Sequence, residues 1–389
     1  MAIEICLVTS TRADWGLLRP VARLVRDDPY FNLSIVATGS HCSSRFGRTS
    51  AEIVADGFTI AHEVPILEET AKAADDARSV VHALAAATSG FGDLLPRLKP
   101  DLAIILGDRY EILGVTQACL LMGVPVAHLC GGDITEGAFD DAIRHAITKL
   151  SHVHFPSNAD SGNRLIRMGE DPENVHVVGS TGLDTMRETQ FLSRAEVFSR
   201  LGLPICDRML LVTFHPPTLS EVPGPQQFAE LAAAFDLLDP TIAIVLTGSN
   251  ADPAGWEMTR LAEAYASQRA NSVFRMSLGQ LLYLSTMREA SALVGNSSSG
   301  LYEAPSFGIA TINIGDRQRG RLRAASVIDV APDRQAICSS IEAAIDADWS
   351  HVVNPYGDGH SAPRIIAHLK RLRNPHSLLN KRFSEWKMP

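Results

Sequence analysis

The chain has 389 residues, 46% of them hydrophobic and 20% charged, a composition typical of about two or three globular domains and unlike that of a disordered protein. Its 35 Lys and Arg residues against 44 Asp and Glu residues give a formal net charge of −9, and the basic residues are scattered singly. This pattern argues against a nucleic-acid-binding protein, so an anionic ligand must be bound by a few local groups.

The chain starts with a short apolar run at residues 3–8, with no basic leader and no apolar stretch long enough to span a membrane. Six widely spaced cysteines without a Cys-x-x-Cys pair argue against a zinc ribbon or a disulfide framework and indicate reduced thiols. We therefore expect a cytoplasmic protein without a membrane partner.

Short apolar runs recur along the chain and alternate with helical patterns such as 78–98 and 225–238. After the first run they lie at 33–37, 102–106, 124–128, 152–155, 175–178, 209–213, 242–246, 292–294 and 310–314. Runs that are apolar throughout are typical of strands buried on both faces. The sequence therefore predicts an α/β fold of parallel sheets with helices on both sides.

The apolar runs fall into two sets that are separated near residues 180–208. Each set has about the length of one Rossmann-like domain, so we predict two doubly wound domains that face a cleft. We place the first domain, with the catalytic carboxylates, at 1–182 and the second at 183–369. A C-terminal helix at 370–389 is expected to complete the first domain.

The first predicted strand is followed by a hydroxyl-rich loop that contains Arg12 and Asp14 and leads into a helix. Backbone N–H groups at a helix N-terminus can bind an anion, and Arg12 adds a forked cation. The turn lacks the Gly-Lys-Ser/Thr signature of a P-loop. An ordinary helix cap beside a surface arginine is the alternative interpretation.

Asp108 and Arg109 follow the predicted strand at 102–106. Ligands of open parallel sheets bind beyond the carboxyl ends of the strands, so we interpret this pair as a base and an anion clamp. We expect Arg109 to keep Asp108 ionised by proximity. A structural ion pair is the alternative.

Four carboxylates surround glycines just beyond the predicted strand at 124–128. They are Asp133, Glu136, Asp140 and Asp141. Like charges that lie close together raise the pKa of at least one of them, which can supply both an acid and a base at neutral pH. A Mg²⁺ or Ca²⁺ site is the alternative. Nothing marks a zinc site at His128, His152 and His154, which we interpret as packed, hydrogen-bonded side chains.

Polar residues also follow the predicted strands of the second half. They are His215, Asn250, the stretch 295–300 with Ser297 and Ser298, Glu303, and Arg317. A glycine and serines that open a helix can bind a phosphate, Glu303 can accept two ribose hydroxyls, and Arg317 can bind a phosphate. A serine-capped helix is the alternative, and no Gly-x-Gly-x-x-Gly motif supports a dinucleotide site.

Together these motifs resemble the UDP-N-acetylglucosamine 2-epimerase family, and within it the hydrolysing branch that serves sialic-acid, legionaminic-acid and related nonulosonic-acid synthesis. The matching residues are 11–14, 38–41, 107–109, 131–133, 140–150, 215–216, 295–300 with Glu303, and 356–359. They span nearly the whole chain in order, and the block at 140–150 is specific to the hydrolysing branch.

The resemblance implies the two-lobed fold of GT-B glycosyltransferases, a UDP-sugar substrate, UDP as a product, a homodimer, and neither a cofactor nor a metal. It implies ligand-binding roles for Arg12, Asp14, His41, Asn250, Ser297, Ser298, Glu303 and Arg317. The catalytic candidates are Asp108, Arg109, Asp133, Glu136, Asp140 and His215, the last also resembling a nucleotide contact.

One position departs from the family. Relatives often have a glutamate directly before the Gly-Gly pair, where this chain has Cys130. A thiol is a poor substitute for a carboxylate base, so we expect Asp133 or Glu136 to take over the missing role. The loop at 133–140 resembles that of bacterial members that act on UDP-N,N′-diacetylbacillosamine as well as on UDP-N-acetylglucosamine.

The implied reaction is an elimination followed by a hydration. A carboxylate removes the proton at sugar C2 while UDP leaves C1, and water then adds to the resulting 2-acetamidoglycal as a proton returns to the opposite face of C2. The product is a free manno-configured sugar. The alternatives are a non-hydrolysing 2-epimerase, a GT-B glycosyltransferase and a catalytically silent nucleotide-sugar-binding protein.

Overall fold

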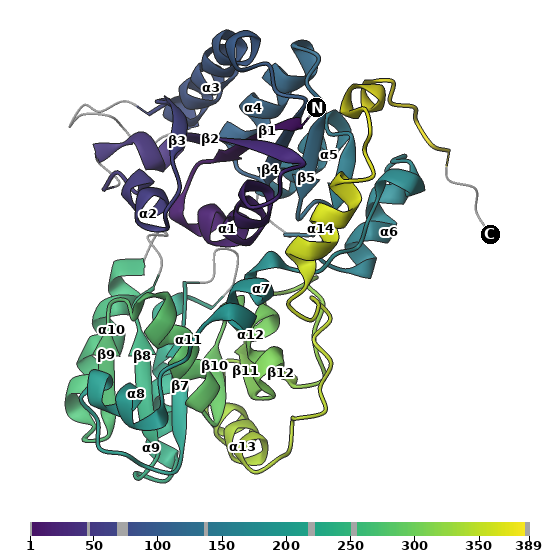
Figure 1. The fold of residues 1–389 in the computed structure, drawn as a ribbon. Helices are drawn as coiled ribbons and strands as arrows, with labels where there is room; N and C mark the ends of the chain where they lie inside the picture. The colour runs from purple at the N-terminus through teal and green to yellow at the C-terminus, as the bar shows by residue number, and fades with distance from the viewer. Residues whose placement is uncertain are drawn as a thin grey trace. The chain divides into compact units, whose positions relative to one another are not determined.

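The computed structural model describes residues 2–44, 47–67, 77–135, 139–216, 222–249 and 255–385. The chain divides into two units, each built on a parallel six-stranded sheet (Figure 1). Unit 1 comprises Met1–Arg187 and Tyr356–Pro389, and unit 2 comprises Glu188–Pro355. No helix among the described residues is long and apolar enough to cross a membrane.

The sheet of unit 1 has the strand order β3-β2-β1-β4-β5-β6. Its strands are β1 (Ile3–Thr9), β2 (Phe31–Thr38), β3 (Ile60–Val64), β4 (Leu102–Leu106), β5 (Val126–Leu129) and β6 (Val153–Phe155). Alternate residues of β1 enter separate cores: Ile5 and Leu7 lie on one face, whereas Cys6 and Val8 lie on the other. This two-sided burial explains why the central strands are apolar throughout.

Helices cover both faces of this sheet (Figure 1). One face packs against α1 (Arg12–Arg26), α2 (Ser50–Ala55) and α14 (Ser361–Leu369), and the other against α3 (Ala77–Leu98), α4 (Tyr110–Leu121) and α5 (Phe139–Leu150). The remaining helices of unit 1 are α6 (Ala159–Arg167), α7 (Thr181–Glu188) and the short 3₁₀ helices η1 (Gly39–Cys42), η3 (Pro172–Asn174) and η5 (Pro375–Leu379).

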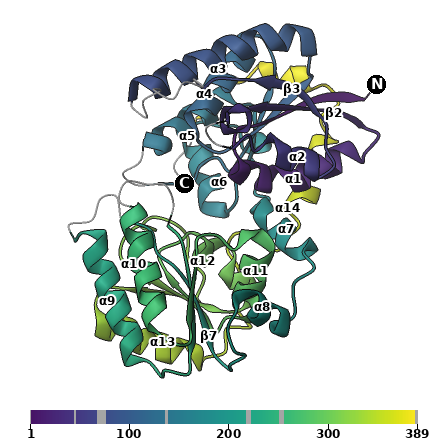
Figure 2. The same cartoon turned by 90° about the vertical axis from the view of Figure 1, so that its left-hand side faces the viewer.

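The sheet of unit 2 has the order β12-β11-β10-β7-β8-β9. Its strands are β7 (Met209–Thr213), β8 (Ala243–Thr247), β9 (Ser272–Arg275), β10 (Ala292–Gly295), β11 (Ala310–Ile314) and β12 (Val327–Val330). One face packs against α9 (Gly224–Leu237), α10 (Gly255–Gln268) and α13 (Arg334–Ile345), and the other against α8 (Arg194–Leu201) and α11 (Gly279–Glu289) (Figure 2). The short helices α12 (Ser299–Tyr302) and η4 (Ala304–Phe307) follow β10.

The predicted fold class, two doubly wound parallel sheets, is confirmed. The predicted strand at 175–178 was wrong, because this segment contributes only a single bridge from Val175 to His154. The C-terminal helix lies at Ser361–Leu369 and not at 370–389, where the described residues contain only η5. Asp184 of α7 accepts hydrogen bonds from the backbone N–H groups of Ser361 and Ala362, which joins the start of α14 to unit 1.

Candidate active site

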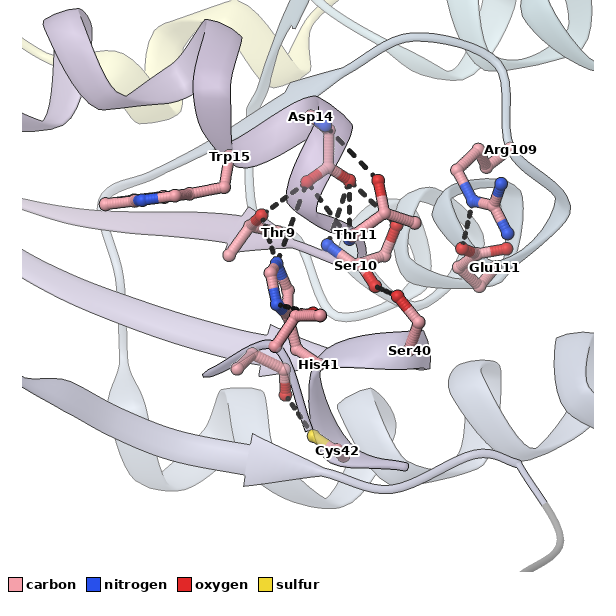
Figure 3. Close-up of polar contacts among 12 residues, drawn as sticks. Thr9, Ser10, Thr11, Asp14, Trp15, Ser40, His41, Cys42, Arg109 and Glu111 are labelled. Atoms are coloured by element: carbon pink, nitrogen blue, oxygen red, sulfur yellow. Dashed lines mark hydrogen bonds and ion pairs between the residues drawn. The ribbon is translucent and has the colours of Figure 1, made fainter. Parts of the chain in front are cut away.

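The turn after β1 is organised by Asp14 (Figure 3). The Asp14 carboxylate accepts hydrogen bonds from the Thr9 hydroxyl at 2.5 Å, the Ser10 hydroxyl at 2.8 Å and the Ser10 backbone N–H at 2.9 Å. It also accepts from the Thr11 backbone N–H, while Thr11 caps the helix by accepting from the Asp14 backbone N–H. Asp14 therefore fixes the turn from inside, and its oxygens are occupied by protein donors.

His41 extends this buried network (Figure 3). The Thr9 hydroxyl donates to Asp14 and therefore accepts from His41 Nε2, at 3.0 Å, which leaves Nδ1 to accept from the Thr49 hydroxyl at 2.8 Å. Burial lowers the pKa of His41, which favours the neutral ring. Arg12 differs from both, because its side chain is 69% exposed and lies 3.4 Å from Glu52.

Asp108 follows β4 at the turn that Gly107 makes with a φ of 83°. Its ion-pair partner is Arg144 of α5, not the predicted Arg109. The Arg144 side chain is 6% exposed and also donates to the Asp133 carbonyl at 2.7 Å and the Thr135 hydroxyl at 3.0 Å. Through these contacts Arg144 holds the loop after β5 against Asp108 and places a guanidinium beside that carboxylate.

Arg109 pairs instead with Glu111, in the first turn of α4 (Figure 3). The Arg109 Nε donates to Glu111 Oε1 at 2.5 Å. The Glu111 side chain is 1% exposed, and its Oε2 has no hydrogen-bond partner among the described residues. No pattern in the sequence marks Arg144 or Glu111 as a site residue, although each lies within four residues of a predicted one.

Asp133 binds the residues at the start of α6. Its carboxylate accepts from the hydroxyls of Ser161 at 2.5 Å and Ser157 at 3.3 Å, and from the Asn158 side-chain amide at 3.2 Å. Asn158 in turn caps α6 through the Ser161 backbone N–H. Asp133 thus links the loop after β5 to this helix, in place of joining a carboxylate cluster.

Cys130 occupies a left-handed backbone conformation, with a φ of 61°. Burial, with a contribution from Asp133, raises the pKa of its thiol to about 12. The thiol is therefore protonated at neutral pH and cannot serve as a base.

Asp140 lies in the first turn of α5. Burial raises its pKa, Glu111 adds to this effect, and Arg109 opposes it. Asp141 accepts from the Thr135 backbone N–H at 2.7 Å. Glu136 lies outside the described residues, and among those that are described no group of three or more His, Cys, Asp or Glu side chains could hold a metal ion.

The three histidines behind this loop are hydrogen-bonded, as predicted. His128 Nε2 donates to the Gly107 carbonyl at 2.8 Å, His152 Nδ1 accepts from the Val126 backbone N–H, and His154 Nε2 donates to Glu170 at 2.8 Å. Burial lowers the pKa of His128 to about 3, which keeps it neutral beneath the turn that carries Asp108.

In unit 2, the ends of β7 and β10 are joined through His215 and Asn296. The His215 backbone N–H donates to Asn296 Oδ1 at 2.7 Å, and Asn296 Nδ2 donates to the His215 carbonyl at 2.8 Å. Burial and Arg317 lower the pKa of His215 to about 4. A Cβ on Gly295 would lie 2.0 Å from the Thr213 carbonyl oxygen, so this close approach of the two strand ends requires glycine.

Ser297 and Ser298 precede α12, which is only four residues long. The hydroxyls of Ser297 and Ser299 lie 3.0 Å apart, and Ser299 also contacts the Tyr283 hydroxyl at 2.6 Å. Arg317 donates to the Asn296 carbonyl at 3.3 Å. Asn250 lies outside the described residues.

Glu303 follows α12, and its Oε2 is buried without a hydrogen-bond partner among the described residues. Burial raises the pKa of Glu303 to about 8. A buried acceptor without a donor is costly, and ligand hydroxyls could supply the missing hydrogen bonds.

Comparison with known proteins gives matches over most of the chain. Residues 23–370 match the family model of UDP-N-acetylglucosamine 2-epimerase. A GDP/UDP-N,N′-diacetylbacillosamine 2-epimerase (hydrolyzing) from Campylobacter jejuni is 39% identical over 327 residues, 84% of each chain. Polysialic acid biosynthesis protein P7 from Escherichia coli is 35% identical over 378 residues, 95% of each chain. A crystal structure of the Neisseria meningitidis UDP-GlcNAc 2-epimerase bound to UDP-GlcNAc has a TM-score of 0.74 at 18% identity, covering 95% of this chain and 100% of that one.

Proposed function

The chain belongs to the UDP-N-acetylglucosamine 2-epimerase family, on its hydrolysing branch, and we propose that it acts on UDP-N-acetylglucosamine or UDP-N,N′-diacetylbacillosamine. The proposed products are UDP and the free manno-configured sugar, which would serve nonulosonic-acid synthesis. The names of the relatives from Campylobacter jejuni and Escherichia coli support this choice of substrate and pathway. None of the six cysteines, all of which lie among the described residues, forms a disulfide, which supports a reducing compartment such as the cytoplasm.

The observation that carries the mechanism is the unlike environment of two carboxylates in unit 1. Asp108 is paired with the buried Arg144, whereas burial raises the pKa of Asp140. Inversion at C2 needs one ionised group to remove a proton and one protonated group to return a proton to the opposite face. We therefore assign Asp108 as the base and Asp140 as the acid.

The reaction then proceeds in two steps. Asp108 takes the C2 proton as the C1–O bond breaks, and UDP leaves with the electron pair to give the 2-acetamidoglycal. Asp140 next protonates C2 as water adds to C1, and solvent restores both carboxyl groups. Arg317, Ser297 and Ser298 of unit 2 are proposed to stabilise the departing diphosphate, with Glu303 accepting from the ribose hydroxyls.

Three further predicted residues of unit 1 take supporting roles in this proposal. Asp14, His41 and Asp133 position their loops, because their side chains are already hydrogen-bonded within unit 1. Cys130 takes no part in proton transfer, because its thiol is not ionised at neutral pH.

The test is a panel of UDP-sugars that includes both proposed substrates, with UDP release followed over time and the sugar identified by mass spectrometry. We expect equal amounts of UDP and a free 2-epimerised sugar from at least one of the two. Formation of UDP-N-acetylmannosamine with the nucleotide still attached would instead identify a non-hydrolysing epimerase. The absence of UDP release from every substrate would overturn the proposal.

A further inference from the structure

Glu111 is a fully buried carboxylate that the mechanism above does not use. One of its oxygens binds Arg109 at 2.5 Å, and the other has no hydrogen-bond partner in the described part of the chain. Unit 1 offers a direct contrast in Glu170, which is also 1% exposed but binds Lys149, Lys381 and His154. A buried carboxylate with one unsatisfied oxygen contributes little to the stability of the fold. Its contact with Arg109 therefore indicates a role other than stability.

The Glu111–Arg109 pair lies beside the loops that follow β1 and β2 (Figure 3). A Cβ built on Gly39 would lie 3.3 Å from Glu111 Oε1 and 2.9 Å from the Ser10 carbonyl oxygen. Glycine at this position therefore lets the β2 loop close over the carboxylate. The loop therefore passes close to Glu111, and Glu111 in turn binds the Arg109 guanidinium.

We propose that Glu111 is a positioning residue that holds the Arg109 guanidinium beside Asp140 and so sets the charge environment of the catalytic acid. This inference rests on the proposed function for the role of Asp140. The placement of the three groups does not depend on that role, because Arg109 and Glu111 start α4 and Asp140 starts α5, the helix that packs against it.

The charged groups that face Asp140 act in opposite directions. From α4, Arg109 stabilises the Asp140 carboxylate and Glu111 destabilises it. On α5 itself, Arg144 lies 3.6 Å from Asp141 and also pairs with Asp108. Removing Glu111 should therefore make Asp140 a stronger acid, and removing Arg109 should make it a weaker one.

The experiment compares Glu111→Gln, Arg109→Gln and the double variant in the full chain. The pKa of Asp140 is read from carboxyl ¹³C NMR of Asp-labelled protein, with Asp140→Asn to assign the signal. We expect the pKa to rise in Arg109→Gln. Glu111→Gln should lower it less in the wild type than in the Arg109→Gln background, because in the wild type the loss of Glu111 also releases the Arg109 guanidinium. The basic limb of the kcat profile should move in the same directions, because Asp140 must be protonated to donate.

If Glu111 acts through Arg109, Glu111→Gln should lower kcat by about 10- to 100-fold, and the double variant should lose no more than Arg109→Gln alone. Glu170→Gln is the matched control: it should lower the unfolding temperature and leave both the Asp140 pKa and the basic limb in place. Glu111→Asp, which keeps the charge, provides a second variant if Glu111→Gln does not fold.

An unchanged Asp140 pKa in both glutamine variants, or additive losses of kcat in the double variant, would overturn the role of Glu111. The NMR titration needs no turnover, so a wild-type protein that releases no UDP would overturn the proposed function alone.

Discussion

Three acidic site residues of unit 1 and Glu303 of unit 2 differ in how far their hydrogen bonds are satisfied by the protein itself. In unit 1, Asp14, Asp108 and Asp133 are held by hydroxyl, amide or guanidinium groups of the same unit. In unit 2, Glu303 is buried with an oxygen that the described residues leave unsatisfied. The first arrangement is typical of a preorganised catalytic site, and the second of a binding site that the ligand completes.

This contrast suggests a division of labour. Groups that transfer protons must be held in fixed positions before the substrate arrives, because small displacements are costly in rate. A group that only binds the ligand can be left without a hydrogen-bond donor in the free protein, because the ligand supplies the donor on binding. The variants below therefore test whether catalysis and nucleotide binding can be lost separately.

The largest effect is expected from Asp108→Asn and Asp140→Asn. Each removes a proton-transfer group, so kcat should fall by about 10²- to 10⁴-fold. The dissociation constant of UDP should change by less than about threefold, because neither carboxylate is proposed to contact the nucleotide. Calorimetry with UDP and a mass-spectrometric assay of the free 2-epimeric sugar measure the two quantities, and unchanged formation of that sugar in both variants would place the catalytic groups elsewhere.

Arg144→Met should have the next largest effect. It leaves Asp108 without its charged partner and frees the loop after β5, so the free energy of unfolding should fall by about 3 kcal/mol and kcat by about 100-fold. Arg19→Met is a suitable control, since its pair with Asp56 is about one-third exposed and should contribute less than about 1 kcal/mol. Equal losses of stability in the two variants would contradict the proposal that Arg144 holds Asp108 and the loop after β5 together.

Glu303→Gln tests whether unit 2 contributes to UDP binding and not to proton transfer. Losing the charged acceptor should weaken UDP binding by about 10- to 100-fold. At saturating substrate, kcat should stay within about tenfold of the wild type. A large loss of kcat with unchanged affinity would remove the proposed division between the units.

The pH dependence of binding sharpens this prediction. Burial raises the pKa of Glu303 to about 8 in the free protein, so the group is mostly protonated at pH 7, whereas ribose hydroxyls donate to the ionised form. Affinity should therefore rise by roughly tenfold from pH 7 to pH 9, with proton release on binding, and Glu303→Gln should abolish the rise. UDP-N-acetylglucosamine bound to Asp108→Asn is the appropriate ligand, because this variant lacks the base that starts the elimination and because the diphosphate of the ligand does not titrate in this range.

Local patterns in the sequence predicted which strand ends carry the polar residues, but not how those residues pair. Asp108 precedes Arg109 in the chain, yet its partner is Arg144, 36 residues later, because the end of β4 and helix α5 come together only in the folded unit. Asp14 resembled a ligand-binding group, although a Thr followed three residues later by an acid is also the pattern of a capping box. The short, half-buried edge strands β3, β9 and β12 lack the continuous apolar run that marks the central strands.

The most direct test of the account is the reaction of the wild type and Asp140→Asn in D₂O, with products identified by NMR and mass spectrometry. We predict that the wild type releases UDP and a 2-epimeric free sugar with one deuterium at C2. Asp140→Asn should release UDP with the 2-acetamidoglycal and no 2-epimer, since Asp108 can still remove the C2 proton. A free sugar that retains its C2 proton, or a 2-epimer formed as fast by Asp140→Asn as by the wild type, would contradict the account.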